Sequence, residues 1–316
     1  MNSEYMQRKK TGMPNGCMVV GSITIDHNHE GGSMTLQRGG VAIYGGLALR
    51  RHGVETTVIV NVAEEHALLL APLHKEGVCV VSGASKMTTT FVNRVEGERR
   101  SQTLLARADP IQAEMVEKFV SDSAHFHLGP LHPEDIAGDV YEVLATAGVT
   151  VSLDIQGLVR SIEGTKVLLR GSPRLASALR CSRYIKADEN EMSAACRYFS
   201  MDLTSIMKEF MIEEALVTRG GKGGYLVGSS GQAVPYNALT AGKPKATVGV
   251  GDVFFATYMA YRLHRGDCAV DSLKEAIFSA AEQTAGRFID SRELSIDVNS
   301  LPVTKGVSRQ KEGTSV

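Results

Sequence analysis

Short apolar runs alternate along the chain with longer segments, and this pattern predicts strands connected by helices. Residues 17–21 (Cys-Met-Val-Val-Gly) and 57–60 are typical of buried strands. Between them, residues 41–51 carry apolar side chains among small ones and end before His52-Gly53, which indicates a helix with a glycine stop. Further strands are expected at 124–128, 149–153, 184–186 and 215–218. The alternation predicts an α/β fold, with a mostly parallel sheet and helices on both of its faces.

One β-branched segment departs from this pattern. Residues 87–93 alternate, Glu96-Gly97 supplies a turn, and residues 99–105 run back, as in a β-hairpin. Because both faces of the hairpin carry many polar residues, we place it outside the main sheet. It is predicted to belong to a small β lid formed by segments 24–40 and 86–108.

Polar residues follow the predicted strands at their carboxyl ends. They are Asp26, Asp154, Lys186 and Thr218. Since ligands of parallel α/β sheets bind beyond the carboxyl ends of the strands, we expect these four side chains to converge on one crevice.

Composition and charge restrict the class of protein. The 316 residues are 43% apolar and 22% charged, which is ordinary for a globular protein, and we expect a single domain over residues 1–316 with mobile tails at 1–15 and 304–316. A net charge of −1 leaves no basic surface for nucleic acid or an anionic membrane, so neither is expected as a partner. No apolar run has the length of a signal peptide or transmembrane helix, which predicts a cytoplasmic location.

The cysteines and histidines give no metal-binding pattern in the sequence. The five cysteines fall in no spacing typical of zinc sites, and we interpret them as reduced thiols. His125 and His127 share one face of a predicted strand and could bind a metal. Because no third ligand lies nearby in the sequence, a structural role is favoured for both.

The segment Gly249-Val250-Gly251-Asp252 carries the strongest chemical signal. Its two glycines open a long apolar helix, so the backbone can turn sharply and present unpaired N–H groups to an anion. Asp252 lies in the first turn, where the helix dipole favours an ionised carboxylate that could accept a proton from an attacking hydroxyl. An ordinary helix start with an acidic first turn is the alternative. Walker A and GxGxxG motifs are absent from the sequence.

Together with the rest of the chain, this segment resembles the signature of the ribokinase (PfkB-type) family of carbohydrate kinases, Asp-Thr-x-Gly-Ala-Gly-Asp. Residues 246–252 match it except that Ala246 replaces the first Asp and Val250 replaces the central Ala. The resemblance implies that Asp252 is the catalytic base. It also implies that Gly249, Val250 and Gly251 form the anion hole, and that ATP is the phosphoryl donor.

Other stretches resemble the same family in the same order along the chain. Gly39-Gly40 is similar to the N-terminal di-glycine motif, although Tyr44 occupies the position of the family's Asn. By this likeness Asp26 would bind substrate hydroxyls, and Gly39 and Gly40 would lie at the root of the lid on the substrate side.

The second half of the chain resembles the family's donor side. Asp188-Glu-Asn-Glu191 is similar to the Asn-x-x-Glu motif, which implies that Asp188 and Glu191 act with Mg²⁺. The loop of Thr218, Gly220 and Gly223 is similar to the nucleotide loop Thr-x-Gly-x-x-Gly, and Lys186 is assigned to the same side. The Ala-rich stretch 273–288 would wall an adenine pocket.

A closer resemblance to the archaeal-type myo-inositol kinases of this family lies in residues 88–90, 98–100, 104–111 and 154–160. It implies that Gln156 and Arg160 lie on the substrate side. A turn residue before Gly157 and a surface ion-pair partner are the alternatives for these two positions.

The function predicted from the sequence is Mg²⁺-dependent transfer of the ATP γ-phosphoryl group to a hydroxyl of a sugar or polyol, with myo-inositol as the best single acceptor. A nucleoside or amino-sugar kinase on the same fold is one alternative, and a non-catalytic ligand sensor is another. The protein is expected to be a monomer or a homodimer formed through the lid.

Overall fold

The structure, a computed structural model, describes residues 16–96, 99–121, 123, 125–240 and 248–297. The predicted tails, the hairpin turn at Gly97 and the signature position Ala246 therefore lie outside the described residues.

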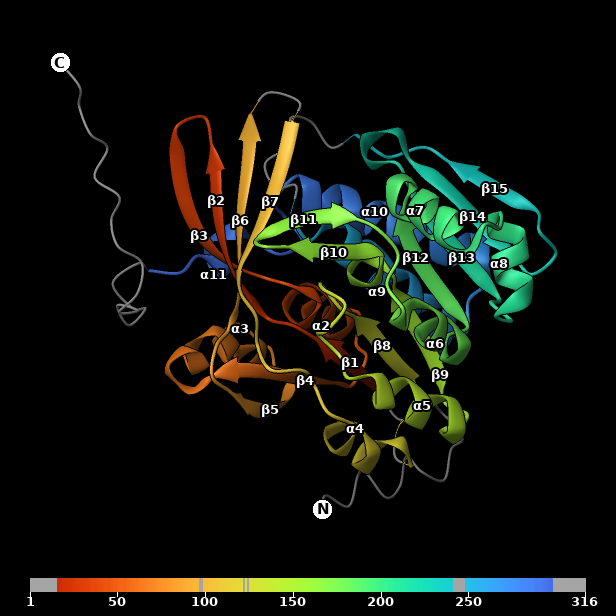
Figure 1. The fold of residues 1–316 in the computed structure, drawn as a ribbon. Helices are drawn as coiled ribbons and strands as arrows, with labels where there is room; N and C mark the ends of the chain where they lie inside the picture. Colours follow the sequence, from red (N-terminus) through yellow and green to blue (C-terminus); the bar gives the residue numbers. More distant parts are fainter. Residues whose placement is uncertain (1–15, 97–98, 122, 124, 241–247, 298–316) are drawn as a thin grey trace.

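A nine-stranded sheet forms the centre of the molecule (Figure 1). Its strands, in spatial order, are β15 (Ala233–Tyr236), β14 (Gly224–Gly228), β13 (Glu214–Thr218), β12 (Tyr184–Asp188), β9 (Thr150–Asp154), β8 (His125–Gly129), β1 (Cys17–Gly21), β4 (Thr56–Ala63) and β5 (Cys79–Ser85). The strands from β13 to β5 run parallel, β14 is antiparallel to β13, and β15 is antiparallel to β14. The mostly parallel sheet expected from the apolar runs is confirmed, with β5, β14 and β15 as strands that the sequence analysis missed.

Helices cover both faces of this sheet, and its central strands are buried on both sides. In β1, Met18 and Val20 pack into one core, and Cys17 and Val19 pack into the other. The first core includes residues of α4 (Ala113–Val120), α5 (Gly138–Ala147), α6 (Arg174–Cys181), α7 (Glu189–Phe199) and α8 (Leu203–Glu209). The opposite face is covered by α2 (Val41–Arg51), α3 (Ala71–Lys75), α9 (Val250–Met259), α10 (Ala269–Thr284) and α11 (Ser291–Leu294).

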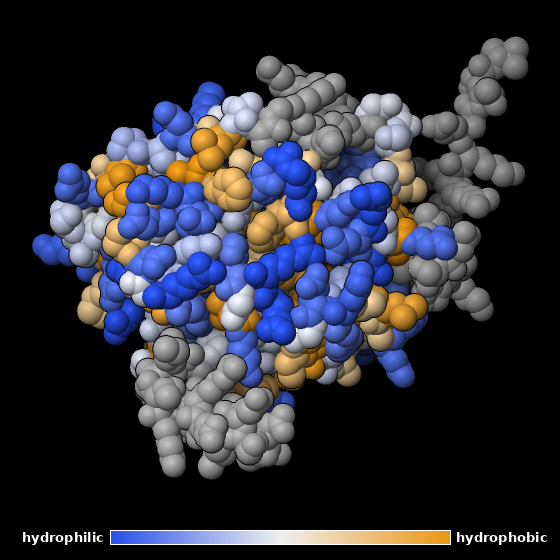
Figure 2. Space-filling model, turned by 180° about the vertical axis from the view of Figure 1, so that it is seen from behind, coloured by the Kyte–Doolittle hydropathy of each residue, from blue (hydrophilic) through white to orange (hydrophobic). Residues whose placement is uncertain are grey.

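The surface agrees with this layered arrangement. Seen from behind, hydrophilic side chains cover most of the molecule and apolar ones are scattered among them (Figure 2). None of the helices in the described part of the chain combines the length and apolar character that a membrane crossing requires.

A second sheet of six strands stands against the first (Figure 1). In spatial order it contains β10 (Arg160–Glu163), β11 (Lys166–Leu169), β7 (Arg99–Ala106), β6 (Thr89–Glu96), β2 (Thr24–Glu30) and β3 (Ser33–Gly39). The segments predicted to form the lid supply β2, β3, β6 and β7, with β6 and β7 paired as the expected hairpin. Strands β10 and β11 were not expected.

The chain passes between the two sheets through very short connections. Strand β1 ends at Gly21 and β2 begins at Thr24, while β3 ends at Gly39 and α2 begins at Val41. Gly40 has a φ angle of 87°, and a Cβ atom at this position would overlap the carbonyl oxygen of Ser22. Only glycine fits this crossing without strain.

Candidate active site

One pocket with a volume of about 540 Å³ lies between the second sheet, the carboxyl ends of the central strands and the start of α9. This volume is within the usual range for small-molecule sites. The site residues predicted from the sequence line the pocket, except Gly39 and Asp154. Asp154 was expected at the same crevice, but it is buried against Lys186 and does not form the wall. A Cβ atom at Gly39 would overlap the carboxyl group of Asp26. Gly39 therefore leaves room for the Asp26 side chain, which lines the pocket, although Gly39 itself does not.

The glycine turn at residues 249–251 forms the start of α9. Gly249 is left-handed, with φ 75°, and a Cβ atom there would overlap the ring of Tyr44. A Cβ atom at Gly251 would lie 3.0 Å from Lys186 Nζ. Because the first N–H groups of a helix have no partner within it, this turn offers backbone donors to an anion in the pocket.

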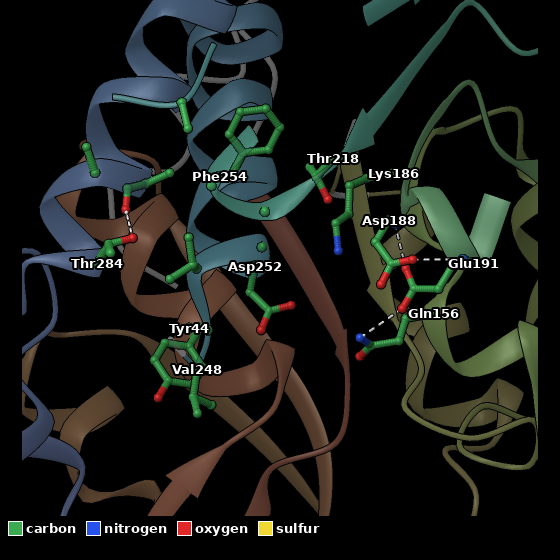
Figure 3. Close-up of a pocket in the computed structure, with 18 of the residues that line it drawn as sticks. Tyr44, Gln156, Lys186, Asp188, Glu191, Thr218, Val248, Asp252, Phe254 and Thr284 are labelled. Carbon is green, nitrogen blue, oxygen red and sulfur yellow. Dashed lines mark hydrogen bonds between the residues drawn. The ribbon is translucent and has the colours of Figure 1, made fainter. Parts of the chain in front are cut away.

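Asp252 points from α9 into the pocket, opposite Gln156 and Glu191 (Figure 3). Burial, together with the nearby carboxylates of Asp154 and Glu191, raises the pKa of its carboxyl group to about 7, although Lys186 and Arg160 lower it. The sequence analysis expected the helix dipole to keep Asp252 ionised. The structure corrects this, because loss of solvent and two neighbouring carboxylates outweigh the dipole.

Lys186 and Asp154 form a buried ion pair beside Asp252, with 2.8 Å between Nζ and Oδ2. Burial alone would lower the pKa of Lys186, but the carboxylates of Asp154, Glu191 and Asp252 raise it above its usual range. Lys186 therefore brings a permanent positive charge to the pocket.

Asp188 and Glu191 form a capping box at the start of α7. Asp188 Oδ1 accepts a hydrogen bond of 2.8 Å from the Glu191 N–H, and Glu191 Oε2 accepts one of 2.7 Å from the Asp188 N–H. Gln156 Nε2 donates to Glu191 Oε1 at 3.1 Å. These bonds fix both carboxyl groups at the pocket wall.

The same two carboxyl groups are suited to Mg²⁺. Burial and the charge of Glu191 raise the pKa of Asp188, because a negative charge on Asp188 is unfavourable in these surroundings. A cation bound between the two carboxyl groups would offset this cost. Mg²⁺ prefers oxygen ligands and commonly binds through one or two carboxylates together with water and substrate phosphates. The residues present fit this ion.

The end of the pocket beyond Lys186 combines a glycine loop with an apolar wall. Gly220 and Gly223 have positive φ angles, of 55° and 85°, in the loop after β13. The opposite wall is formed by α10 and by aromatic residues that stack on each other, Tyr236 and Phe254, with 5.6 Å between their ring centroids. Small residues of α10, namely Ala280, Ala281 and Thr284, line this arm of the pocket.

The other end of the pocket is polar and is formed by the second sheet. Asp26 accepts a hydrogen bond of 2.7 Å from Thr24 Oγ1 and is only 6% exposed. Beside it, Gln102 Nε2 donates to Asn93 Oδ1 at 2.9 Å, and Asn93 Nδ2 donates to Asn28 Oδ1 at 2.9 Å. Asn93 and Gln102 line the pocket, and this amide chain orients their side chains.

Arg160 and Gln156 complete the polar end from the η2 segment (Gln156–Val159) and the start of β10. Arg160 donates to the Leu131 carbonyl at 2.9 Å and lines the pocket. Both residues contribute to the pocket wall, so Gln156 is more than a turn residue and Arg160 is more than a surface ion-pair partner.

The sequence analysis missed Asn93 and Gln102 and treated Tyr44 only as a departure from the family pattern. Alternation of polar residues in the hairpin was the one available signal for the two amides.

Comparison with known protein families matches residues 15–285 to the pfkB family carbohydrate kinases. Comparison with curated protein sequences finds no match. Among solved structures, the chain is similar to a pyrophosphate-dependent kinase of the ribokinase family complexed with a pyrophosphate analog and myo-inositol. The two share 22% identity over 85% of this chain and 94% of that chain, with a TM-score of 0.74.

Two further solved structures show the same fold. A nucleoside kinase from Burkholderia thailandensis, complexed with inosine, has 17% identity, a TM-score of 0.70, and coverage of 87% of this chain and 93% of that chain. Ribokinase from Arabidopsis thaliana, complexed with ribose and ATP, has 18% identity, a TM-score of 0.67, and coverage of 92% and 98%.

At these identities the solved structures establish the ribokinase-like α/β fold that the sequence predicted. The family match spans most of the chain and includes the glycine turn with Asp252. This protein belongs to the pfkB family of carbohydrate kinases.

Proposed function

We propose that this carbohydrate kinase transfers the γ-phosphoryl group of ATP to a hydroxyl of a sugar or polyol, with Mg²⁺ as cofactor and myo-inositol as the best single acceptor. The observation that carries the proposal is the position of Asp252. Its carboxyl group, with a pKa of about 7, lies beside a turn of backbone donors, between a polar and an apolar arm of one pocket.

Asp252 is suited to act as a general base at neutral pH. A base works best when its pKa lies near the operating pH, because a sufficient fraction is ionised and still accepts protons well. The acceptor hydroxyl would donate its proton to Asp252 Oδ as its oxygen attacks phosphorus. The N–H groups at the start of α9 would stabilise charge on the transferring group.

Asp188 and Glu191 would hold Mg²⁺ at the same wall. When bound, this ion would neutralise negative charge on the phosphates. Lys186 adds a fixed positive charge close to Gly251. Its ion pair with Asp154 holds the ammonium group in place, so little reorganisation is needed when the phosphate enters.

The apolar arm favours ATP as donor. Tyr236, Ile277 and Ala280 line the pocket beside the glycine loop, and their apolar surfaces would suit a flat base. Pyrophosphate is the second candidate donor, because one of the structures similar to this chain is that of a pyrophosphate-dependent kinase. A pyrophosphate donor would leave this arm without a ligand.

The polar arm favours an acceptor with several hydroxyl groups. The carboxylate of Asp26 can accept from hydroxyls, and the amides of Asn93, Gln102 and Gln156 can donate or accept. A similar structure contains myo-inositol, which supports this acceptor. We further propose that the second sheet acts as a lid that excludes water during transfer. Monomer and homodimer through this lid stay open alternatives.

An acceptor panel tests the proposal. ATP and pyrophosphate are each incubated with Mg²⁺ and either myo-inositol, ribose, an amino sugar or inosine, and the phosphorylated product is followed by ³¹P NMR. We expect product from ATP with myo-inositol. Product with inosine alone would indicate a nucleoside kinase, and product with the amino sugar alone would indicate an amino-sugar kinase. ATP binding without any product would support a non-catalytic sensor.

A further inference from the structure

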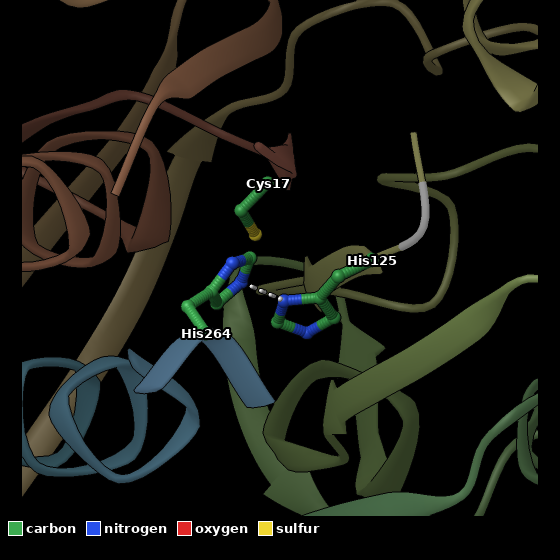
Figure 4. Close-up of side chains that lie close together, drawn as sticks. All are labelled: Cys17, His125 and His264. Atoms are coloured by element: carbon green, nitrogen blue, oxygen red, sulfur yellow. Dashed lines mark hydrogen bonds between the residues drawn. The ribbon is translucent and has the colours of Figure 1, made fainter. Parts of the chain in front are cut away.

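A second group of chemically active side chains lies outside the pocket, among the first residues of two central strands. Cys17 is the first residue of β1 and His125 is the first residue of β8, and the two are register partners in neighbouring parallel strands. His264 comes from the π-helix η4 (Ala260–Arg265), which continues α9. Figure 4 shows the Cys17 thiol and the two imidazole rings gathered at one point.

The distances within this group suit a single metal ion. One ligand atom from each of Cys17, His125 and His264 lies within 4.8 Å of the others, and the described residues contain no second group of three such ligands. His125 Nδ1 and His264 Nε2 are 3.0 Å apart. Tetrahedral Zn²⁺, with Zn–N of about 2.0–2.1 Å and Zn–S of about 2.3 Å, separates its ligand atoms by roughly 3.3–3.6 Å. Small side-chain movements reach that geometry.

The outer contacts orient His125 toward this point. Ser152 Oγ lies 2.8 Å from His125 Nε2 and 2.7 Å from His127 Nδ1. If Ser152 accepts from the first ring and donates to the second, His125 carries its proton on Nε2 and turns the lone pair of Nδ1 to the cluster. Metal-binding histidines are typically held in this way through their other ring nitrogen.

The cluster is shielded from solvent. Cys17 and His125 are buried, and His264 is half-buried. The cluster lies near the C-terminal end of the α9–η4 helix, where the helix dipole favours positive charge.

We propose that Cys17, His125 and His264 bind one Zn²⁺ ion, with water as the fourth ligand, and that this ion ties the end of the α9–η4 helix to β1 and β8. Binding exchanges the thiol proton of Cys17 for a sulfur–zinc bond, and the proton goes to solvent. Affinity is therefore expected to rise with pH. Soft thiolate and imidazole ligands favour Zn²⁺ over the Mg²⁺ expected at Asp188 and Glu191.

Metal titration of the purified full chain tests this site. The protein is stripped with chelator, excess Mg²⁺ is added to occupy carboxylate sites, and Co²⁺ is titrated as a spectroscopic substitute for Zn²⁺. We expect one equivalent to bind with a thiolate-to-cobalt charge-transfer band, and Zn²⁺ to displace it. Loss of an outer contact already weakens metal sites by about 10–100-fold, so Cys17→Ser and His264→Gln should each weaken binding by about 100-fold or more.

Cys181→Ser is the matched control, because Cys181 is also a buried thiol but lies in α6 and contacts the Ala178 carbonyl. It should retain the charge-transfer band and the wild-type affinity. The half-buried His264 provides a second variant if Cys17→Ser does not fold. Absence of the band in the wild-type chain would overturn the site, as would equal binding by wild type and both variants.

Discussion

Lys186 Nζ lies 2.8 Å from Asp154 Oδ2, in an ion pair whose side chains are each 6% exposed. The two charges act on Asp252 in opposite directions, since Asp154 raises the pKa of that carboxyl group and Lys186 lowers it. The ion pair therefore sets the ionisation of the proposed base as well as fixing the two strands.

Replacing Asp154 and replacing Lys186 should shift the pH dependence of turnover in opposite directions. Asp154→Asn removes a negative charge, so the pKa of Asp252 falls and the acidic limb of kcat/KM moves to lower pH. Lys186→Met removes a positive charge and moves the limb to higher pH. The measurement is kcat/KM for the acceptor across pH 5 to 9 at saturating donor. Lys274→Met breaks an exposed pair with Asp271 and should leave the profile unchanged. Shifts in the same direction for both variants would contradict this electrostatic account.

Replacing Asp252 with Asn should remove turnover without removing donor binding. A positioned general base contributes about 10²–10⁴-fold to the rate, and kcat should fall by this factor. Donor affinity should be equal or greater, because a negative charge near the phosphates is lost. Steady-state kinetics and calorimetric titration with ATP measure the two quantities. Retained turnover would exclude Asp252 as the base.

The same substitution should stabilise the fold at alkaline pH. The pKa of Asp252 is raised to about 7 in the folded chain from an ordinary value of 3.8. Between these values the folded state binds more protons than the unfolded state. The contribution of protonated Asp252 to the free energy of unfolding is therefore fully present below pH about 4 and is lost as pH rises through about 7. Asp252→Asn should accordingly melt above the wild type at pH 8 and level with it near pH 4. A lower melting temperature at pH 8 would argue against the raised pKa.

Gly249→Ala should damage both stability and turnover. The left-handed backbone and the ring of Tyr44 leave no room for a Cβ atom at this position. We expect a loss of more than about 1 kcal/mol in the free energy of unfolding, together with loss of anion binding. Gly138→Ala at the start of α5 is the control, because a Cβ atom there has open space. Denaturant titration of both variants makes the comparison.

Asn93→Ala should weaken acceptor binding selectively. Its amide is held by Gln102 and Asn28 and faces the polar arm, so losing one hydrogen bond to the acceptor is worth about tenfold in KM. The donor KM should stay unchanged. Gln37→Ala, at the far end of the amide chain, should have a smaller effect because Gln37 does not line the pocket. An equal rise in both KM values would indicate a general structural effect.

Strands with two buried faces could be found from the sequence, and strands at the sheet edges could not. Residues of β1 and β8 are all buried because helices cover both sides, and the apolar run of β1 makes its strand pattern clear. Residues of β5 are half-exposed or exposed, and β10 and β11 are short strands without a buried residue. Residues 24–40 were assigned to the β lid, but no strand bounds were predicted for Thr24–Glu30. Its strand character depends on hydrogen bonds to β3 and β6, which come from elsewhere in the chain.

The position of the glycine turn could be predicted because its spacing is local. The ionisation of Asp252 could not, since it depends on Asp154 and Glu191, which become neighbours only in the fold. The pairing of Asn93 with Gln102 likewise depends on hairpin register. Cys17 and His264 are separated by most of the chain, which is why no sequence spacing indicated the metal cluster.

The crossing at Gly40 links the second sheet to the glycine turn at residues 249–251 through α2. One turn after Gly40, α2 places Tyr44 against Gly249, so a rotation of β3 would press on the backbone that is proposed to receive the phosphate. Linked equilibria are reciprocal: an acceptor that moves the sheet would change donor affinity by the same factor as the donor changes acceptor affinity. The two substrates are therefore expected to bind with synergy, and the rigid contact of one tyrosine with one glycine would carry the communication between their sites.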